Sequence, residues 1–156
     1  MITIIAAVSS NWCIGSDGKI PWNIPGDMKH FRDITMGGTV VMGRKTWESL
    51  PSKYKPLPGR TNVVLTRSSE YVLPRGVVRA RSLHEVSTTC SNLLVVGGAS
   101  VYQQAMSTAT SMVLTTVNMI VHGDTYFPAV DWSMWMLLAE QYYSTYSIRS
   151  YARVGT

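Results

Sequence analysis

The sequence has few cysteines and no long apolar run. Cys13 and Cys90 are its only cysteines, which is too few for a disulfide framework, and no metal ligand stands at a suitable spacing around them. We therefore expect two free thiols. No apolar stretch reaches the roughly 18 residues that cross a bilayer, and the start, residues 1–5, lacks the basic segment of a signal peptide. These absences predict a cytoplasmic protein.

Metal and nucleophile motifs are also missing. The histidines, His30, His84 and His122, have no Cys, His or carboxylate partner at ligand spacing, so a core or surface role is favoured over metal binding. No serine stands in a G-x-S-x-G motif, and an incidental role is favoured for Cys13 over a catalytic thiol. We expect neither a metal site nor covalent catalysis.

What is present predicts one folded domain. The 156 residues are 46% hydrophobic and 15% charged, so apolar burial offsets chain entropy and a disordered chain is excluded. Short β-branched runs alternate with helical patterns, which predicts an α/β domain over residues 1–156 with a mostly parallel sheet. The expected strands are residues 2–8, 39–42, 62–66, 76–78, 92–96 and 112–117, and the expected helices are 27–35, 45–50, 83–86 and 101–106.

Two segments depart from this alternation. Residues 132–153 are rich in Trp, Tyr and Met and predict an antiparallel C-terminal hairpin that closes the sheet. Residues 9–26 form the one long gap between predicted elements, with three Gly, two Pro and two Trp. Loops of this length in a small domain are usually functional or disordered, and the tryptophans favour a functional lid.

Positive charge is concentrated in one stretch. Nine of the fourteen Lys and Arg residues lie between residues 44 and 81 with only two acids, so this stretch carries +7 and the other 118 residues carry −2. An anionic ligand is implied. A small polyanion is favoured over nucleic acid because the cations are scattered through strands and turns without clustered aromatics. A solvated basic face stays open as the alternative.

Two strand-to-helix junctions are candidates for phosphate binding. Gly97–Gly98 follows an apolar strand and opens a helix, which exposes backbone N–H groups, although its spacing is not the dinucleotide fingerprint and a plain tight turn explains it equally well. The junction at residues 42–46, M-G-R-K-T, adds two cations and a hydroxyl. Such junctions share one edge of a parallel sheet, so together with Thr66–Arg67 they could converge on one extended ligand.

Asp27 is the most informative acid. It starts an expected helix among apolar neighbours, and on sequence alone a helix N-cap is the favoured role. The functional alternative is a half-buried carboxylate that pairs with the N–H/NH₂ fork of a heterocycle, in the bidentate geometry known from Arg. Thr115, in a late strand, would supply the accompanying hydroxyl.

The most specific signal is a series of motifs along nearly the whole chain. They are I-I-A-A at 4–7, I-G at 14–15, I-P-W-N-I-P-G-D at 20–27, V-M-G-R-K-T-W-E-S-L at 41–50, L-P-G-R at 57–60, V-V-G-G-A at 95–99, V-Y at 101–102 and G-D-T-Y-F-P at 123–128. In order and spacing they resemble the dihydrofolate reductases. The resemblance implies NADPH-dependent reduction of 7,8-dihydrofolate to tetrahydrofolate on an α/β sheet closed by an antiparallel C-terminal strand.

On the substrate side, the resemblance assigns to Asp27 the 2-amino and N3 positions of the pterin, with help from Thr115. It assigns to Arg60 the α-carboxylate of the glutamate tail, with a looser contact from Arg32. The implied apolar walls are Ile5, Met28, Phe31, Leu50, Leu57 and Val96. The implied catalytic group comprises Asp27, Thr115, Trp22 and Ile20.

On the cofactor side, the resemblance implies NADPH bound by backbone at Ala7 and Ile14, by phosphate contacts at residues 44–46 and by a 2′-phosphate site at Thr66 and Arg67. It also implies a cis peptide at Gly97–Gly98, in a backbone that a Cβ would crowd. The full implied set is Ala7, Ile14, Gly15, Ile20, Gly43, Arg44, Lys45, Thr46, Leu65, Thr66, Arg67, Arg81, Val96, Gly97, Gly98, Ala99, Ser100, Val101 and Tyr102. The basic stretch then neutralises NADPH and the folate tail.

The implied mechanism is direct hydride transfer from nicotinamide C4 to pterin C6, with protonation at N5. We expect a monomer that binds small molecules, antifolates among them, and neither nucleic acid nor membrane. Two alternatives remain: another pterin or pyrimidine reductase on the same fold, which the presence of Arg60 disfavours, and a nucleotide- or nucleic-acid-binding module without catalysis.

Overall fold

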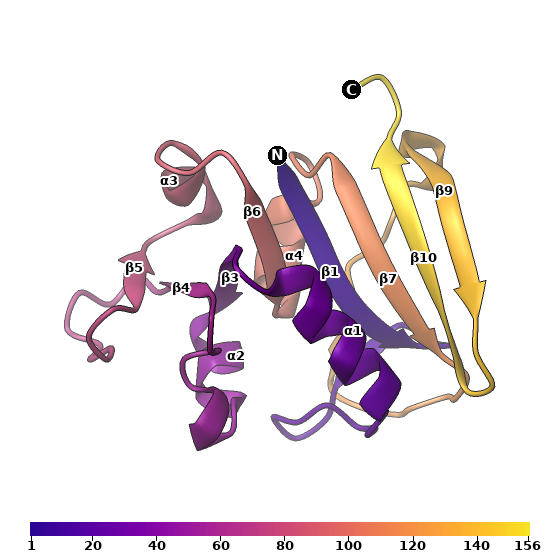
Figure 1. Ribbon diagram of the computed structural model, residues 1–156, viewed down its shortest axis with the longest axis horizontal. Helices are drawn as coiled ribbons and strands as arrows, with labels where there is room; N and C mark the ends of the chain where they lie inside the picture. Colours follow the sequence, from indigo (N-terminus) through magenta and orange to yellow (C-terminus); the bar gives the residue numbers. More distant parts are fainter.

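An eight-stranded sheet forms the centre of the molecule in a computed structural model that describes residues 1–156. Its strand order is β5-β4-β3-β6-β1-β7-β10-β9, with β9 and β10 at one end and β5 at the other (Figure 1). The strands are β1 (Ile2–Ser9), β3 (Thr39–Gly43), β4 (Thr61–Leu65), β5 (Val78–Ala80), β6 (Leu93–Gly97), β7 (Ser111–Val117), β9 (Trp135–Tyr142) and β10 (Tyr146–Arg153).

All neighbours from β5 to β7 pair in parallel, and β10 runs antiparallel to both β7 and β9. The predicted α/β class, mostly parallel sheet and closing hairpin are therefore confirmed. A small second sheet pairs β2 (Cys13–Gly15) with β8 (Thr125–Tyr126). The helices are α1 (Pro25–Thr35), α2 (Arg44–Ser49), α3 (Leu83–Ser87) and α4 (Ala99–Ala105), and 3₁₀ turns lie at Ser52–Tyr54 and Trp132–Met134.

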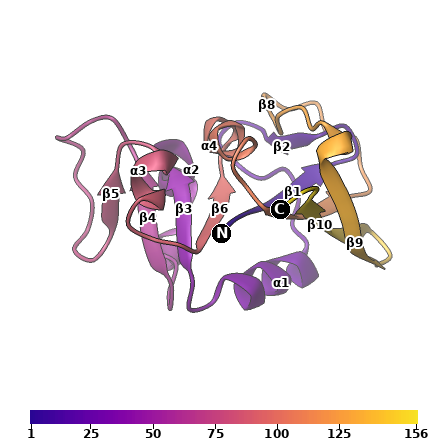
Figure 2. The ribbon, with the colours of Figure 1, turned by 90° about the horizontal axis from the view of Figure 1, so that it is seen from above.

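The core lies on both faces of the sheet because successive strand residues point to opposite sides. In β3, Val41 joins the large cluster that contains residues of α3 and α4, whereas Val40 and Met42 join a smaller one around Trp47 of α2. Phe31 of α1 packs against this second cluster. Accordingly, α1 and α4 lie on opposite sides of the sheet (Figure 2).

Three expected elements begin two residues away from their predicted starts, and the other starts differ by at most one residue. Helix α1 begins at Pro25, two residues before the predicted start, because proline is well suited to the first helical position. Strand β5 spans 78–80 instead of 76–78, because Gly76 adopts φ +91° in a turn. Helix α4 begins at Ala99, directly after Gly98.

The segment 9–26 is more ordered than a single long loop, since it contains β2, which is paired with β8. It is also not the only long connection, because residues 66–77 between β4 and β5 contain neither helix nor strand. Both thiols, Cys13 and Cys90, are unpaired. None of the helices has the length and apolar character needed to cross a membrane.

Candidate active site

One large cavity runs along the carboxyl ends of the parallel strands. Its volume is about 1740 Å³ and 44 residues line it, whereas a pocket for one small ligand usually measures about 300–1,000 Å³. The three predicted anion-binding segments, residues 42–46, 66–67 and 97–98, all reach it. The prediction that they converge is confirmed, and the cavity has room for two ligands or one long ligand.

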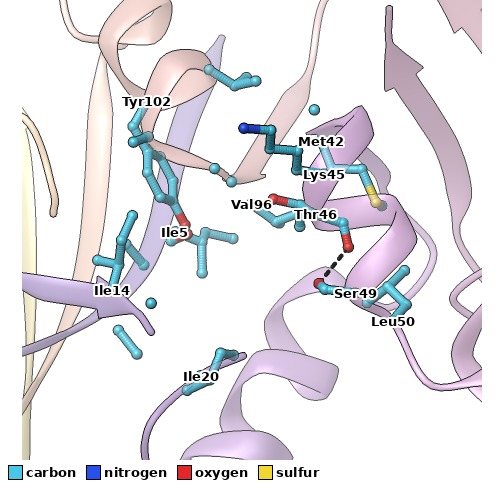
Figure 3. Close-up of a pocket in the computed structure, with 18 of the residues that line it drawn as sticks. Ile5, Ile14, Ile20, Met42, Lys45, Thr46, Ser49, Leu50, Val96 and Tyr102 are labelled. Atoms are coloured by element: carbon cyan, nitrogen blue, oxygen red, sulfur yellow. Dashed lines mark hydrogen bonds between the residues drawn. The ribbon is translucent and has the colours of Figure 1, made fainter. Parts of the chain in front are cut away.

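The lining comes from several elements at once. Figure 3 shows Ile5, Ile14 and Ile20 on one side of the cavity, with Thr46 and Ser49 of α2 and the following Leu50 on the other. Ser49 Oγ donates to the carbonyl oxygen of Thr46 at 2.7 Å. The apolar residues predicted as walls, Ile5, Met28, Phe31, Leu50, Leu57 and Val96, all contribute to the lining.

Asp27 is the one carboxylate at the apolar part of this cavity. The Thr115 hydroxyl, from buried β7, donates to Asp27 Oδ1 at 2.6 Å. Burial raises the pKa of Asp27, and the Thr115 hydrogen bond and the His30 charge offset part of this rise. The N-cap role is wrong: Ile24 occupies the N-cap without a side-chain hydrogen bond, and the Asp27 side chain bonds to Thr115 instead.

Arg60 is anchored at one end of the cavity. Its Nε donates to the carbonyl of Pro58 at 2.8 Å and its Nη1 donates to Thr35 Oγ1 at 3.1 Å. The supporting loop is fixed by the buried Asn62, whose Oδ1 accepts from the N–H of Leu57 at 2.9 Å. The Asn62 amide also donates to the carbonyls of Leu57 and Arg60, at 3.0 and 3.1 Å. The guanidinium is therefore held by its surroundings before any ligand binds.

Two further cations near Arg60 are already paired. Asp33 Oδ2 forms an ion pair with Lys29 Nζ at 3.0 Å, and Asp33 Oδ1 lies 3.6 Å from Arg32 Nη2. All three of these side chains are exposed, so the pairs are weak. Of the three lining cations Lys29, Arg32 and Arg60, only Arg60 has no carboxylate partner.

Glycines line the opposite part of the cavity. A Cβ on Gly97 or Gly98 would lie 3.3 or 3.1 Å from Thr46 Oγ1, and one on Gly43 would lie 3.2 Å from Val101 Cγ2. The expected crowding is therefore confirmed, as is the cis peptide between Gly97 and Gly98. A side chain at these positions would have to displace its neighbours, whereas the glycines leave the backbone N–H groups at the start of α4 accessible to an anion.

The cavity is strongly cationic. Eight Lys and Arg residues line it with only two acids, Asp27 and Asp124. Five of the nine cations of the basic stretch are among them: Arg44, Lys45, Arg60, Arg67 and Arg81. A smaller cavity of about 230 Å³ shares Thr66, Arg67 and Arg81 and adds Ser69, Arg79, Ala80 and Glu85. The basic stretch thus contributes five cations to a ligand cavity. This placement favours anion binding over a basic surface that is only solvated.

The segment 9–26, for which a lid was predicted, is attached to the rest of the chain at two places. Asn11 Nδ2 donates to the carbonyl of Val121 at 2.9 Å, and Asn11 Oδ1 accepts from the N–H of Val121 at 3.0 Å. Near the tip, Asp124 Oδ2 accepts from the N–H of Asp17 at 2.9 Å. Ile20, 66% exposed, lies at the cavity. Trp22 is the only predicted site residue that does not line the cavity. The expected catalytic role of Trp22 is therefore not supported by a contact with the cavity.

Three lining residues, Lys19, Lys29 and Tyr54, lie outside the quoted motifs. Asp124 and Thr125 also line the cavity, and the motif at 123–128 contains them although no site role was predicted for them. His30 is different, because it lies three residues after Asp27 on the same helix face, a spacing readable from the sequence. Its Nε2 is buried without a hydrogen-bond partner. No group of three or more His, Cys, Asp and Glu side chains is arranged to hold a metal ion.

Comparisons with known proteins give a single family. The family model described as dihydrofolate reductase matches residues 1–153. A dihydrofolate reductase of Neisseria meningitidis is 45% identical over 137 residues, which cover 86% of this chain and 83% of the relative. One of Mycobacterium tuberculosis is 43% identical over 134 residues, or 84% and 82% of the two chains.

A solved structure agrees with these relatives. Dihydrofolate reductase from Enterococcus faecalis, complexed with NADP(H) and RAB-propyl, superposes with a TM-score of 0.89 at 30% identity. The match covers 99% of this chain and 96% of that one.

Proposed function

The chain belongs to the dihydrofolate reductase family, and from this premise we propose that it reduces 7,8-dihydrofolate to 5,6,7,8-tetrahydrofolate with NADPH by direct hydride transfer. The observation that carries the proposal is Asp27. It is a half-buried carboxylate, bonded to Thr115, at the apolar part of a cavity that is otherwise cationic. A pterin presents an N–H/NH₂ fork that such a carboxylate can bind through two hydrogen bonds.

The residues of the other part of the cavity fit NADPH. Its phosphates need accessible N–H groups and cations, and the glycines at positions 43, 97 and 98 leave room for close approach of a ligand to the backbone. Arg44, Lys45, Arg67 and Arg81 supply positive charge along the same lining. When bound, NADPH supplies the hydride. We assign the nicotinamide half to Ala7, Ile14, Gly15 and Ile20.

The protein's own contribution is binding, alignment and electrostatics. Asp27, with Thr115 on Oδ1, holds the pterin and favours its N5-protonated form through its negative charge. Arg60 binds the α-carboxylate of the substrate tail, and Arg32 contributes a looser contact. The apolar walls orient the rings, and the lid over Ile20 excludes water from the reacting atoms. Water relays the proton to N5.

Trp22 is not part of this proposal as a residue in contact with the ligands, because it does not line the cavity. The remaining assignments follow the expectations from sequence. We propose a cytoplasmic monomer that supports one-carbon metabolism, and therefore thymidylate and purine synthesis, and that is inhibited by antifolates. Each ligand is a small molecule.

The test is an absorbance assay with the purified protein, NADPH and dihydrofolate. Loss of the nicotinamide absorbance on addition of dihydrofolate, blocked by a diaminopyrimidine antifolate, supports the proposal. Binding of NADPH without such a loss would favour a nucleotide-binding module without catalysis. Loss with a different pterin and not with dihydrofolate would favour another reductase on this fold.

A further inference from the structure

Tyr71 lies outside the cavity lining but contacts one of its cations. The residue belongs to the connection between β4 and β5, and its ring packs against the guanidinium of Arg44, with Cζ 3.9 Å from the ring centroid. Arg44 is the first residue of α2 and lines the cavity. A guanidinium over an aromatic face at this distance is held by a cation–π interaction.

Glu48 completes the surroundings of Arg44. Its Oε2 accepts from Arg44 Nε at 3.5 Å and from the Tyr71 hydroxyl at 3.1 Å. The two terminal Nη groups of Arg44 donate to no protein acceptor. The protein therefore uses one face and the Nε edge of the guanidinium and leaves its two outer nitrogens available.

The position of Tyr71 is itself fixed from a neighbouring strand. Arg79, in β5, donates from its two Nη groups to the carbonyls of Ser68 and Tyr71. This clamp holds the connection against the end of the sheet, although it contains no helix or strand of its own. The ring of Tyr71 is thus attached to the framework that also carries Arg67 and Arg81.

We propose that Tyr71 is a positioning residue for the cofactor site: it holds Arg44 with its outer nitrogens toward a phosphate of NADPH. The inference rests on the proposed function. The physical reason for an aromatic partner is that a ring orients the guanidinium without neutralising it. A second carboxylate would orient Arg44 equally well but would cancel the charge that a phosphate needs. The single exposed pair with Glu48 is too weak to fix the side chain alone.

The test is a double-mutant cycle on NADPH binding, measured in the absence of dihydrofolate by quenching of tryptophan fluorescence. Tyr71→Phe keeps the ring and loses only the hydroxyl bond to Glu48, so its Kd should lie within about twofold of the wild type. Tyr71→Leu removes the ring and should weaken NADPH about two- to fivefold. In an Arg44→Met background, Tyr71→Leu should have no further effect.

Two results from the variants would overturn the inference. One is wild-type affinity in Tyr71→Leu. The other is an equal loss from Tyr71→Leu with and without Arg44, which would mean that the ring acts through the fold of the connection and not through Arg44. The absorbance assay separates this outcome from failure of the proposed function: a protein that binds NADPH, shows the Arg44-dependent effect and does not oxidise NADPH with dihydrofolate would overturn the reductase proposal alone. A wild-type protein that does not bind NADPH would overturn both.

Discussion

The hydroxyl of Thr115 lies 2.6 Å from Oδ1 of Asp27 and joins strand β7 to helix α1 across 88 residues of sequence. Thr115 is buried, whereas Asp27 is half-buried at the cavity. The hydroxyl can donate to a carboxylate without a compensating positive charge, so the carboxylate keeps both its negative charge and a fixed orientation. This relationship is the basis of the first two predictions.

Asp27→Asn should abolish most of the activity at neutral pH. The amide keeps the size of the side chain but removes the charge that favours N5 protonation, so hydride transfer at pH 7 should fall by about 10²- to 10⁴-fold. Part of the rate should return at acidic pH, where solvent protonates the substrate directly. The check is kcat against pH with NADPH and dihydrofolate.

The matched control is Asp33→Asn, the same change two turns along α1 at an exposed carboxylate that does not line the cavity. This variant should keep its rate within about threefold, since exposed ion pairs contribute little. Unchanged turnover of Asp27→Asn at pH 7 would contradict the role given to Asp27.

The same substitution should change the pH dependence of stability. Because burial raises the pKa of Asp27, the folded state holds this proton more tightly than the unfolded state. Ionisation therefore costs the wild type stability as the pH rises from the ordinary carboxyl pKa through the raised folded pKa. Asp27→Asn lacks that loss. Its free energy of unfolding, relative to that of the wild type, should therefore rise over this window, and the difference between the two proteins should stay constant at higher pH.

Urea unfolding of both proteins at a series of pH values from 4 to 8 measures the difference between their free energies of unfolding. If the free energy of unfolding of Asp27→Asn instead fell relative to that of the wild type as the pH rises, the folded pKa of Asp27 would be lowered, with the hydrogen bond from Thr115 outweighing burial.

The sequence predicted the sheet better than the site. A run of consecutive apolar residues such as Val40, Val41 and Met42 is sufficient to indicate a strand with two buried faces, and these residues pack on both sides of the sheet. The start of α1 was missed because Pro25 serves equally well before a helix and within its first turn. For Asp27, local spacing favoured a cap, and only the packing of β7 against α1 provides its partner.

The residues that hold the site in place could not be predicted, for a related reason. Tyr71 and Asp124 act through atoms of segments that the fold brings beside them, whereas Asn62 bonds within its own loop. Neither Tyr71 nor Asn62 belongs to a quoted motif, and the motif that contains Asp124 does not indicate its bond to Asp17. The lining cations were partly predictable because the basic stretch is dense. Periodicity locates strand ends only to within a few residues, so the family motifs were needed to select among the nine cations. The five that the resemblance assigned to ligands, Arg44, Lys45, Arg60, Arg67 and Arg81, all line the cavity.

Gly98→Val should lose NADPH before it loses the fold. A Cβ at this position already lies 3.1 Å from Thr46 Oγ1, and the added methyl groups would fill the space over the N–H groups at the start of α4. We expect NADPH affinity to fall by more than about tenfold, which is the loss of roughly one charge-assisted hydrogen bond. Fluorescence titration and thermal unfolding, run together, separate binding from folding.

A suitable control is Gln103→Val, which adds the same side chain on the exposed side of α4, away from the cavity. It should bind NADPH as the wild type does. Wild-type affinity in Gly98→Val would count against a backbone phosphate site, and a fall in affinity that only tracked a lower Tm would assign the glycine to folding.

Arg67→Gln should narrow the preference for NADPH over NADH. The two cofactors differ only in the 2′-phosphate, and Arg67 lines both the large cavity and the small cationic one beside it, with Thr66 and Arg81. A charge-assisted hydrogen bond contributes about 1.5–3 kcal/mol, which corresponds to about 10- to 100-fold in Kd. Because Arg67 is exposed, we expect the lower end of this range of Kd at moderate salt. The loss of NADPH affinity should be larger at low salt.

NADH affinity should stay unchanged in Arg67→Gln, so the preference narrows through lost NADPH binding alone. Arg75→Gln provides the matched control, since Arg75 is an exposed arginine of the same basic stretch that lines neither cavity. Isothermal titration of both cofactors at two salt concentrations tests the three proteins.

If Arg67→Gln weakened NADH as much as NADPH, Arg67 would be contacting a part that the cofactors share, and the 2′-phosphate would have to be bound by Lys45 or Arg81 instead. If Arg75→Gln matched Arg67→Gln, the effect would come from the overall charge of the stretch and not from a site.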